Sequence, residues 1–140
     1  MVIRFIKSSP CFNHVRVNKF IDFFNDKNID LEFYCWKRKK SESSPDENYL
    51  LGGGGYGTKK LALYYPAWVL SVLVYFLFKN NIKDKFFVID FESALPIYIL
   101  SFLKKDIKYI YDIHDDFSMR YNFPNFINKS ISSIDQKIKS

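Results

Sequence analysis

The sequence has few cysteines and no export signal that can be recognised. Among its 140 residues only Cys11 and Cys35 are cysteines. That is too few for the disulfide framework of a small secreted domain, and their spacing is not that of a zinc site. Arg4 interrupts the first apolar run and no small-residue cleavage site follows, so this run does not read as a signal peptide. These absences predict a reduced, cytoplasmic protein that holds no metal.

Several catalytic motifs are also missing. The sequence has no G-x-S-x-G, H-E-x-x-H or G-x-x-x-x-G-K-[ST], which disfavours hydrolases, zinc proteases and P-loop proteins. Gly52, Gly54 and Gly57 do spell G-x-G-x-x-G, but no acidic residue stands about twenty residues further on. The nearest acids are Asp84 and Asp90. Dinucleotide binding is therefore disfavoured, no cofactor is expected, and the glycine run is interpreted as a tight connection or a loop that a ligand can approach.

The chain is rich in apolar and basic residues. Hydrophobic residues make up 48% of it, including 15 Phe and 10 Tyr, which is enough to build one folded core. Lys and Arg outnumber Asp and Glu by 21 to 15, and the net charge of +6 favours an anionic partner. Lipid head groups and substrate phosphates fit this charge. No motif for RNA or DNA binding supports it, so nucleic acid is not expected as a partner.

Strand and helix patterns alternate along the chain in the order β-α-β-β-α-β-α-β-α. The strands are too apolar to have a solvated face, which predicts an α/β, Rossmann-like, mostly parallel sheet with helices on both faces. Ligands of such sheets bind beyond the carboxyl ends of the strands. The expected strands are residues 2–6, 29–36, 49–51, 86–90 and 108–113; helices are expected to begin near residues 13, 61, 93 and 124, and residues 37–48 are expected to form a flexible surface loop.

The uncharged run at residues 61–78 has three interpretations. By length it reaches the lower limit for a membrane span, but lysines flank both of its ends and give no orientation. It also fits a buried crossover helix, which the α/β alternation requires here, or a helix whose Tyr and Trp face rests on a membrane. The basic run 37–40 beside Trp36 is either a solvated loop or a contact for phosphate or lipid head groups.

Two polar clusters follow expected strands, at positions where chemistry is common in this architecture. One is Asp90–Ser93, and the other is Asp112–Asp116, which contains His114. A histidine beside carboxylates can act as a base, a hydrogen-bond donor to a substrate hydroxyl or a metal ligand. An ordinary polar turn is the alternative for both clusters.

Three segments occur in an order that is typical of a known family. Asn13-His14-Val15-Arg16, followed by residues 33–38, is similar to a D-x-R-V…W-x-R opening in which Asn13 replaces the Asp and Arg16 matches. Residues 88–96 are similar to D-V-I-H-A-x-D…A-L-P, and residues 111–116 to Y-D-x-H-E. Together they resemble the N-terminal domain of glycosyltransferases with the GT-B fold, in particular the family 4-like group.

The resemblance implies that this domain holds a glycan or polyprenyl-linked acceptor, while a C-terminal domain holds the nucleotide-sugar. It further implies that residues 1–140 are an N-terminal domain, incomplete at its C-terminus, on the inner face of the membrane. The donor half would be lost or separate, so the chain alone is expected to be inactive. The implied roles are catalysis for His114, Asp90 and Glu92, substrate binding for Asn13, Arg16, Ser93 and Asp115, and membrane contact for Trp68, Lys59 and Lys60. The alternative is a non-catalytic α/β module that binds a membrane or a partner.

Overall fold

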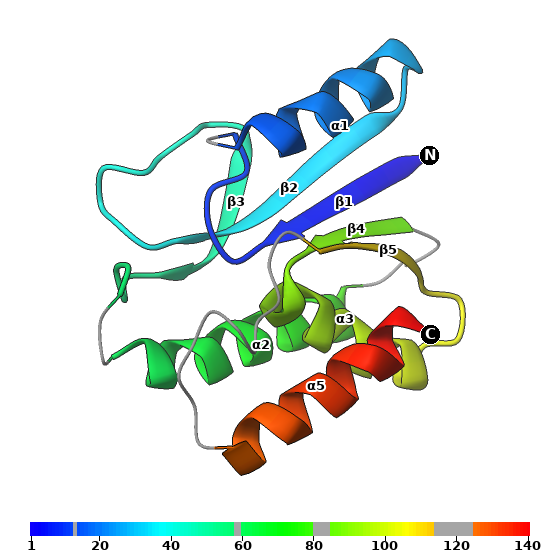
Figure 1. Cartoon of the computed structure of the whole chain (residues 1–140). Coiled ribbons are helices and arrows are strands. Elements are labelled where there is room, and N and C mark those ends of the chain that lie inside the picture. The colour runs from blue at the N-terminus through cyan, green and yellow to red at the C-terminus, as the bar shows by residue number, and fades with distance from the viewer. Residues whose placement is uncertain (13, 58–59, 80–84, 114–124) are drawn as a thin grey trace.

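The structure of the chain, a computed structural model, describes residues 1–12, 14–57, 60–79, 85–113 and 125–140. Five strands form one sheet in the order β3-β2-β1-β4-β5, and every neighbouring pair is parallel (Figure 1). The strands are β1 (Val2–Lys7), β2 (Asp30–Lys37), β3 (Glu47–Gly52), β4 (Lys85–Ile89) and β5 (Lys108–Asp112). The Rossmann-like α/β fold predicted from the sequence is therefore confirmed.

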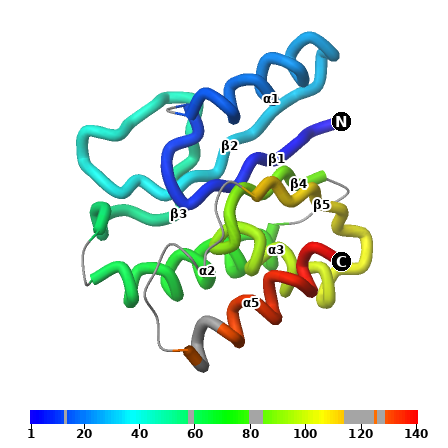
Figure 2. The backbone as a smooth tube through the Cα atoms, in the orientation of Figure 1, coloured from blue at the N-terminus to red at the C-terminus, as the bar shows by residue number. Residues whose placement is uncertain are grey.

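Helices cover both faces of the sheet. Helix α1 (Val15–Asp26) lies on one face, and α2 (Leu61–Phe78), α3 (Phe91–Leu103) and α5 (Asn125–Lys139) lie on the other (Figures 1 and 2). Helix α1 buries Val17, Ile21 and Phe24, which helical spacing places on one side. It ends where Asn28 adopts a left-handed conformation with φ of 51°, a common way to terminate a helix.

The chain changes direction at the centre of the sheet. From β1 it proceeds through α1 to β2 and on to β3 at one edge, and α2 then crosses back to β4 on the other side of β1. Lys7 and Ile89 are paired at the carboxyl ends of β1 and β4. In parallel sheets such a reversal marks the usual ligand position. We call the residues that follow these two strands, 8–12 and 90–93, the switch point.

Helix α2 is the crossover that the sequence requires. It packs on the sheet through Leu61, Trp68, Val72 and Phe76, all of which are buried. The Trp68 ring is fully buried and stacks on Trp36, with ring centroids 6.1 Å apart. The prediction that Trp68 contacts a membrane is therefore wrong, because the helix turns this side chain into the core. Lys60 is exposed and its membrane contact stays a prediction, whereas Lys59 lies outside the described residues.

The segment predicted as a flexible surface loop at residues 37–48 is shorter than expected. Lys37 belongs to β2, and β3 begins at Glu47. Arg38 is buried: its guanidinium lies 4.2 Å from the Trp36 ring centroid, and its Nε donates to the Ser8 carbonyl at 2.7 Å. The basic run is thus divided, because Arg38 faces the protein while Lys39 and Lys40 face solvent.

The glycine run after β3 makes a close approach to aromatic rings. Gly54 has φ of +90°, and a Cβ built there would lie 2.9 Å from Tyr64 and 3.1 Å from Trp36. The Trp36 indole also donates to the Gly53 carbonyl at 2.8 Å. The glycines therefore let the backbone lie against the buried Trp36 ring, which supports the tight-connection interpretation.

We expect Gly54→Ala to lower the free energy of unfolding by about 2 kcal/mol, because the added methyl combines backbone strain with overpacking. Gly52→Ala is the matched control, since a Cβ at Gly52 meets nothing within 4 Å, and it should change stability by less than about 0.5 kcal/mol. Urea denaturation measures both. Equal effects of the two substitutions would contradict the close approach.

Candidate functional site

Asp90 joins β4 to α3 in a conformation that side chains rarely adopt. Its φ is 67° and its ψ is 159°, a region occupied almost only by glycine. The residue is buried, and its backbone N–H donates to the Asp112 carbonyl at 3.1 Å. Strained residues of this kind cluster at functional sites, because the surrounding structure must hold them in place. The predicted catalytic residue Asp90 thus occupies the most strained non-glycine position at the switch point.

An ion pair near Asp90 connects the start of α1 to the end of β5. Nη2 of Arg16, from the first turn of α1, lies 2.5 Å from Oδ1 of Asp112 at the end of β5. The Asp112 side chain is buried, whereas that of Arg16 is 51% exposed. A half-exposed guanidinium held by a buried carboxylate keeps donors that can reach a ligand. The structure therefore brings together Arg16, Asp112 and Asp90, all of which the sequence analysis singled out.

Glu92 and Ser93 occupy the first turn of α3 and are buried. The Ser93 hydroxyl has no hydrogen-bond partner within the described part of the chain. Burial, the hydrogen bond to Asp135 and the negative charges of Asp135, Asp90 and Glu92 raise the pKa of Tyr111. A role for Glu92 as a base would require a substrate proton to reach this buried position.

Four of the predicted site residues, Asn13, Lys59, His114 and Asp115, lie outside the described residues. Their roles stay predictions.

The carboxyl ends of β1 and β2 carry basic residues, in contrast to the acidic residues at the ends of β4 and β5. Lys7, the last residue of β1, and Arg38, just after β2, are both buried. Both hydrogen-bond to the segment that follows β1: the Lys7 ammonium donates to the Ser9 hydroxyl and to the Pro10 carbonyl, and Arg38 donates to the Ser8 carbonyl. Neither forms an ion pair with a carboxylate among the described residues. Buried cations without a counter-charge favour an anionic ligand nearby.

Sequence reasoning identified the basic run after β2 but assigned no role to Lys7 itself. The available signal was a lysine at the carboxyl end of an otherwise apolar strand, where a long side chain ends among the switch-point residues.

The structure also assembles a cluster that spacing along the chain did not reveal. The thiols of Cys11 and Cys35 lie 2.9 Å apart, and Glu47 lies beside them. Oε1 of Glu47 accepts the backbone N–H groups of Cys11 and Phe12 at 2.5 and 3.2 Å, and Oε2 accepts the Tyr49 hydroxyl at 2.5 Å. Burial and this last hydrogen bond raise the pKa of Tyr49 to about 12. Two sulfurs and a carboxylate are donors that could hold a metal ion.

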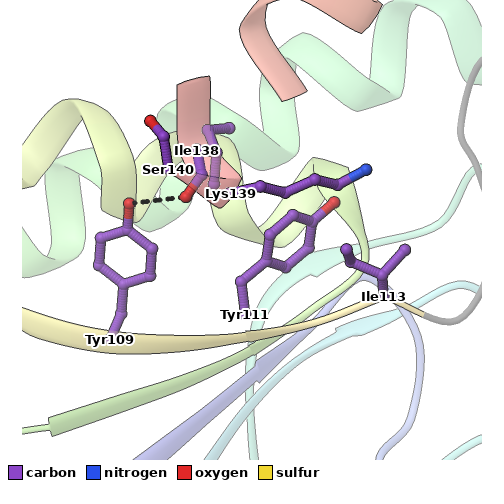
Figure 3. Close-up of a pocket in the computed structure, with 6 residues that line it drawn as sticks. All are labelled: Tyr109, Tyr111, Ile113, Ile138, Lys139 and Ser140. Atoms are coloured by element: carbon purple, nitrogen blue, oxygen red, sulfur yellow. Dashed lines mark hydrogen bonds between the residues drawn. The ribbon is translucent and has the colours of Figure 1, made fainter. Parts of the chain in front are cut away.

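Two surface pockets are formed by the described residues. One, of about 560 Å³, opens between β5 and the end of α5, where the Tyr109 hydroxyl donates to the Ile138 carbonyl (Figure 3). The other, of about 440 Å³, lies under α1 and is lined in part by Phe12, Ile21 and Phe33. Of the predicted catalytic and substrate-binding residues that the structure describes, Arg16, Asp90, Glu92 and Ser93, none lines either pocket.

Fold and site together define a Rossmann-like α/β domain with charged residues gathered at the carboxyl ends of its strands. Comparison with protein-family models, curated proteins and solved structures found no match for the chain. The resemblance to glycosyltransferases therefore rests on the sequence motifs alone.

The strain at Asp90 can be measured by comparing two substitutions that both remove its carboxylate. We expect Asp90→Gly to be about 1–2 kcal/mol more stable than Asp90→Ala, because only glycine tolerates this backbone conformation. At the exposed helical residue Asp22 the order should reverse, with the alanine variant about 1 kcal/mol more stable. Unfolding by urea gives the four values, and the same order at both positions would refute strain at Asp90.

Proposed function

We propose that the chain is the acceptor-binding half of a glycosyltransferase that moves a sugar from a nucleotide-sugar to a glycan or lipid-linked acceptor. The observation that carries the proposal is the strained, buried Asp90 beside the Arg16–Asp112 ion pair at the switch point. All three residues fall within the motifs that resemble GT-B enzymes. A ligand bound beyond β1 and β4 would meet this acidic group on one side and the basic group of Lys7 and Arg38 on the other.

The two groups suit the two ends of a phosphate-linked acceptor. A carboxylate can accept the proton of the attacking hydroxyl as the bond to the sugar forms, and such general bases typically contribute 10²–10⁴-fold to the rate. We assign this role to Asp90, with Glu92 as the second candidate. The Lys7 and Arg38 cations would stabilise the phosphate of the acceptor. His114 and Asp115, which follow β5 in sequence, would complete the sugar side of the site.

Transfer also requires a domain that binds the donor and stabilises the departing diphosphate, which is commonly the largest electrostatic contribution to such a reaction. We propose that this half is a separate polypeptide or a further part of the same protein, and that it faces the switch point.

The assay combines the chain with a donor-binding half and follows sugar transfer to a polyprenyl-phosphate-linked acceptor. Asp90→Asn should reduce kcat at least about 100-fold. Asp30→Asn is the matched control, because Asp30 is exposed at the amino end of β2, on the opposite edge of the sheet, and should leave kcat unchanged. Transfer by the chain without any donor half, or full activity of Asp90→Asn, would contradict the proposal.

A second candidate function, binding to an anionic membrane, is favoured by the outer side of α2. This helix is long and apolar enough to cross a membrane, although 28% of it is buried in the protein. Leu63, Leu70, Val74 and Phe78 follow helical spacing on its outer side, and each is at least half exposed. We call these four residues the outer face of α2.

The outer face of α2 continues onto the end of α3. The Lys104 ammonium donates to the carbonyls of Phe76 and Leu77 at 3.2 and 2.8 Å, so the two helix ends lie together. Phe102 and Leu103 are exposed there. Exposed lysines at residues 60 and 105 flank this surface. Apolar side chains with flanking lysines match the interface of an anionic bilayer.

Vesicle co-sedimentation tests this surface. Leu70→Glu and Phe78→Glu should each weaken binding to vesicles of anionic phospholipid at least about tenfold, since a carboxylate would enter the bilayer interface. Phe23→Glu is the matched control, because Phe23 is an exposed aromatic residue on α1, across the sheet, with 55% of its surface exposed against 59% for Leu70. Equal loss of binding in the control, or equal binding of wild type to neutral vesicles, would contradict a specific membrane face.

A further inference from the structure

We infer that Cys11 and Cys35 form a reversible intramolecular disulfide, with a small-molecule disulfide such as oxidised glutathione as the oxidant. They are the only two cysteines in the chain. Their sulfurs lie 2.9 Å apart, about 0.9 Å farther than the length of an S–S bond. This inference is independent of the proposed transferase activity.

Strand pairing and the hydrogen bonds of Glu47 hold the two thiols close to each other. Cys35 is in β2 and is paired with Lys7 of β1. Cys11 is in the segment after β1, and Glu47 of β3 anchors that segment by accepting the N–H groups of Cys11 and Phe12. Three neighbouring strands therefore fix the position of Cys11 relative to Cys35. The approach of the sulfurs is a consequence of backbone placement.

The geometry suits a disulfide better than a metal. Two thiolates that share one tetrahedral zinc ion lie about 3.8 Å apart, because each Zn–S bond is about 2.3 Å long. The observed separation is shorter. Both oxygens of Glu47 are already engaged as hydrogen-bond acceptors, so a metal would have to displace those donors.

Oxidation proceeds by two exchange steps. The Cys11 sulfur attacks glutathione disulfide, forming a mixed disulfide and releasing one glutathione as thiolate, which takes up the Cys11 proton. The Cys35 sulfur then attacks the Cys11 sulfur, the S–S bond forms, and the second glutathione leaves with the Cys35 proton. Two protein thiols are oxidised while one glutathione disulfide is reduced to two thiols. We assign the first attack to Cys11 because it lies in the segment between β1 and α1, whereas Cys35 lies within β2. Both thiols are buried, so this segment has to open for glutathione disulfide to reach Cys11.

The bridge would tie the segment after β1 to β2. That segment accepts the hydrogen bonds of Lys7 and Arg38 and leads directly to Arg16. Oxidation would therefore restrict the part of the switch point that connects its basic and acidic groups. It would also close residues 11–35 into a loop, which stabilises the folded state by restricting the unfolded chain.

The test incubates the full chain with oxidised glutathione and then measures intact mass, free thiols and Tm. We expect a monomer lighter by two hydrogen atoms, loss of both free thiols, and a rise in Tm of roughly 5–10 °C that dithiothreitol reverses. Cys11→Ala and Cys35→Ala should show no rise in Tm under the same treatment. The wild-type comparison of mass and Tm remains decisive if either variant fails to fold.

Three results would overturn the inference. The first is that both thiols stay free in the folded protein but react after unfolding in urea. The second is that oxidation yields mainly glutathione adducts or covalent dimers. The third is that the purified chain contains one equivalent of zinc and a chelator lowers its Tm, which would assign Cys11, Cys35 and Glu47 to a metal site.

Discussion

Parallel neighbours cannot be joined by tight hairpins, so each connection between the five strands must return along the sheet before the next strand begins. In this chain the return after β3 is α2, which has to pass from one edge of the sheet to the far side of β1. One side of α2 is consequently buried against the strands and its other side remains exposed. The same constraint brings the carboxyl ends of all five strands to one edge, so that Arg16 reaches Asp112 from 96 positions away in sequence.

The buried charged residues at the carboxyl ends of the strands lie where the strands stop, outside the hydrophobic core. Lys7 and Arg38 stand just where β1 and β2 stop, and Asp90 and Asp112 stand where β4 and β5 stop. Desolvated charges are costly unless other groups stabilise them. Here each charge is stabilised by groups next to it. Backbone carbonyls and aromatic rings contact the cations, and Arg16 forms an ion pair with Asp112. The two sides thus remain separate, one basic at the ends of β1 and β2 and one acidic at the ends of β4 and β5.

The sequence was sufficient to predict the order of elements and the parallel sheet, because apolar strands and helical spacing are local signals. It also located the strand-end residues Asp90 and Asp112. It could not determine which side of α2 turns inward, since that helix is apolar all round, and so Trp68 was assigned to a membrane although it stacks on Trp36. Nor could spacing reveal the proximity of Cys11 to Cys35, which depends on strand register and on Glu47 from a third strand.

The segment between β1 and α1 links these features. Within it, Ser8, Ser9 and Pro10 accept the hydrogen bonds of the two buried cations, Cys11 meets Cys35, and the helix that follows presents Arg16 to Asp112. A displacement of this segment would therefore alter both charged groups together. Its position is fixed from β2 and β3 through Arg38, Cys35 and Glu47. It is connected to β5 through Arg16 of the helix that follows, which forms the ion pair with Asp112. The Arg16 side chain is half exposed. A ligand that binds Arg16 in place of Asp112 would therefore loosen the contact between this segment and β5 and leave the core intact.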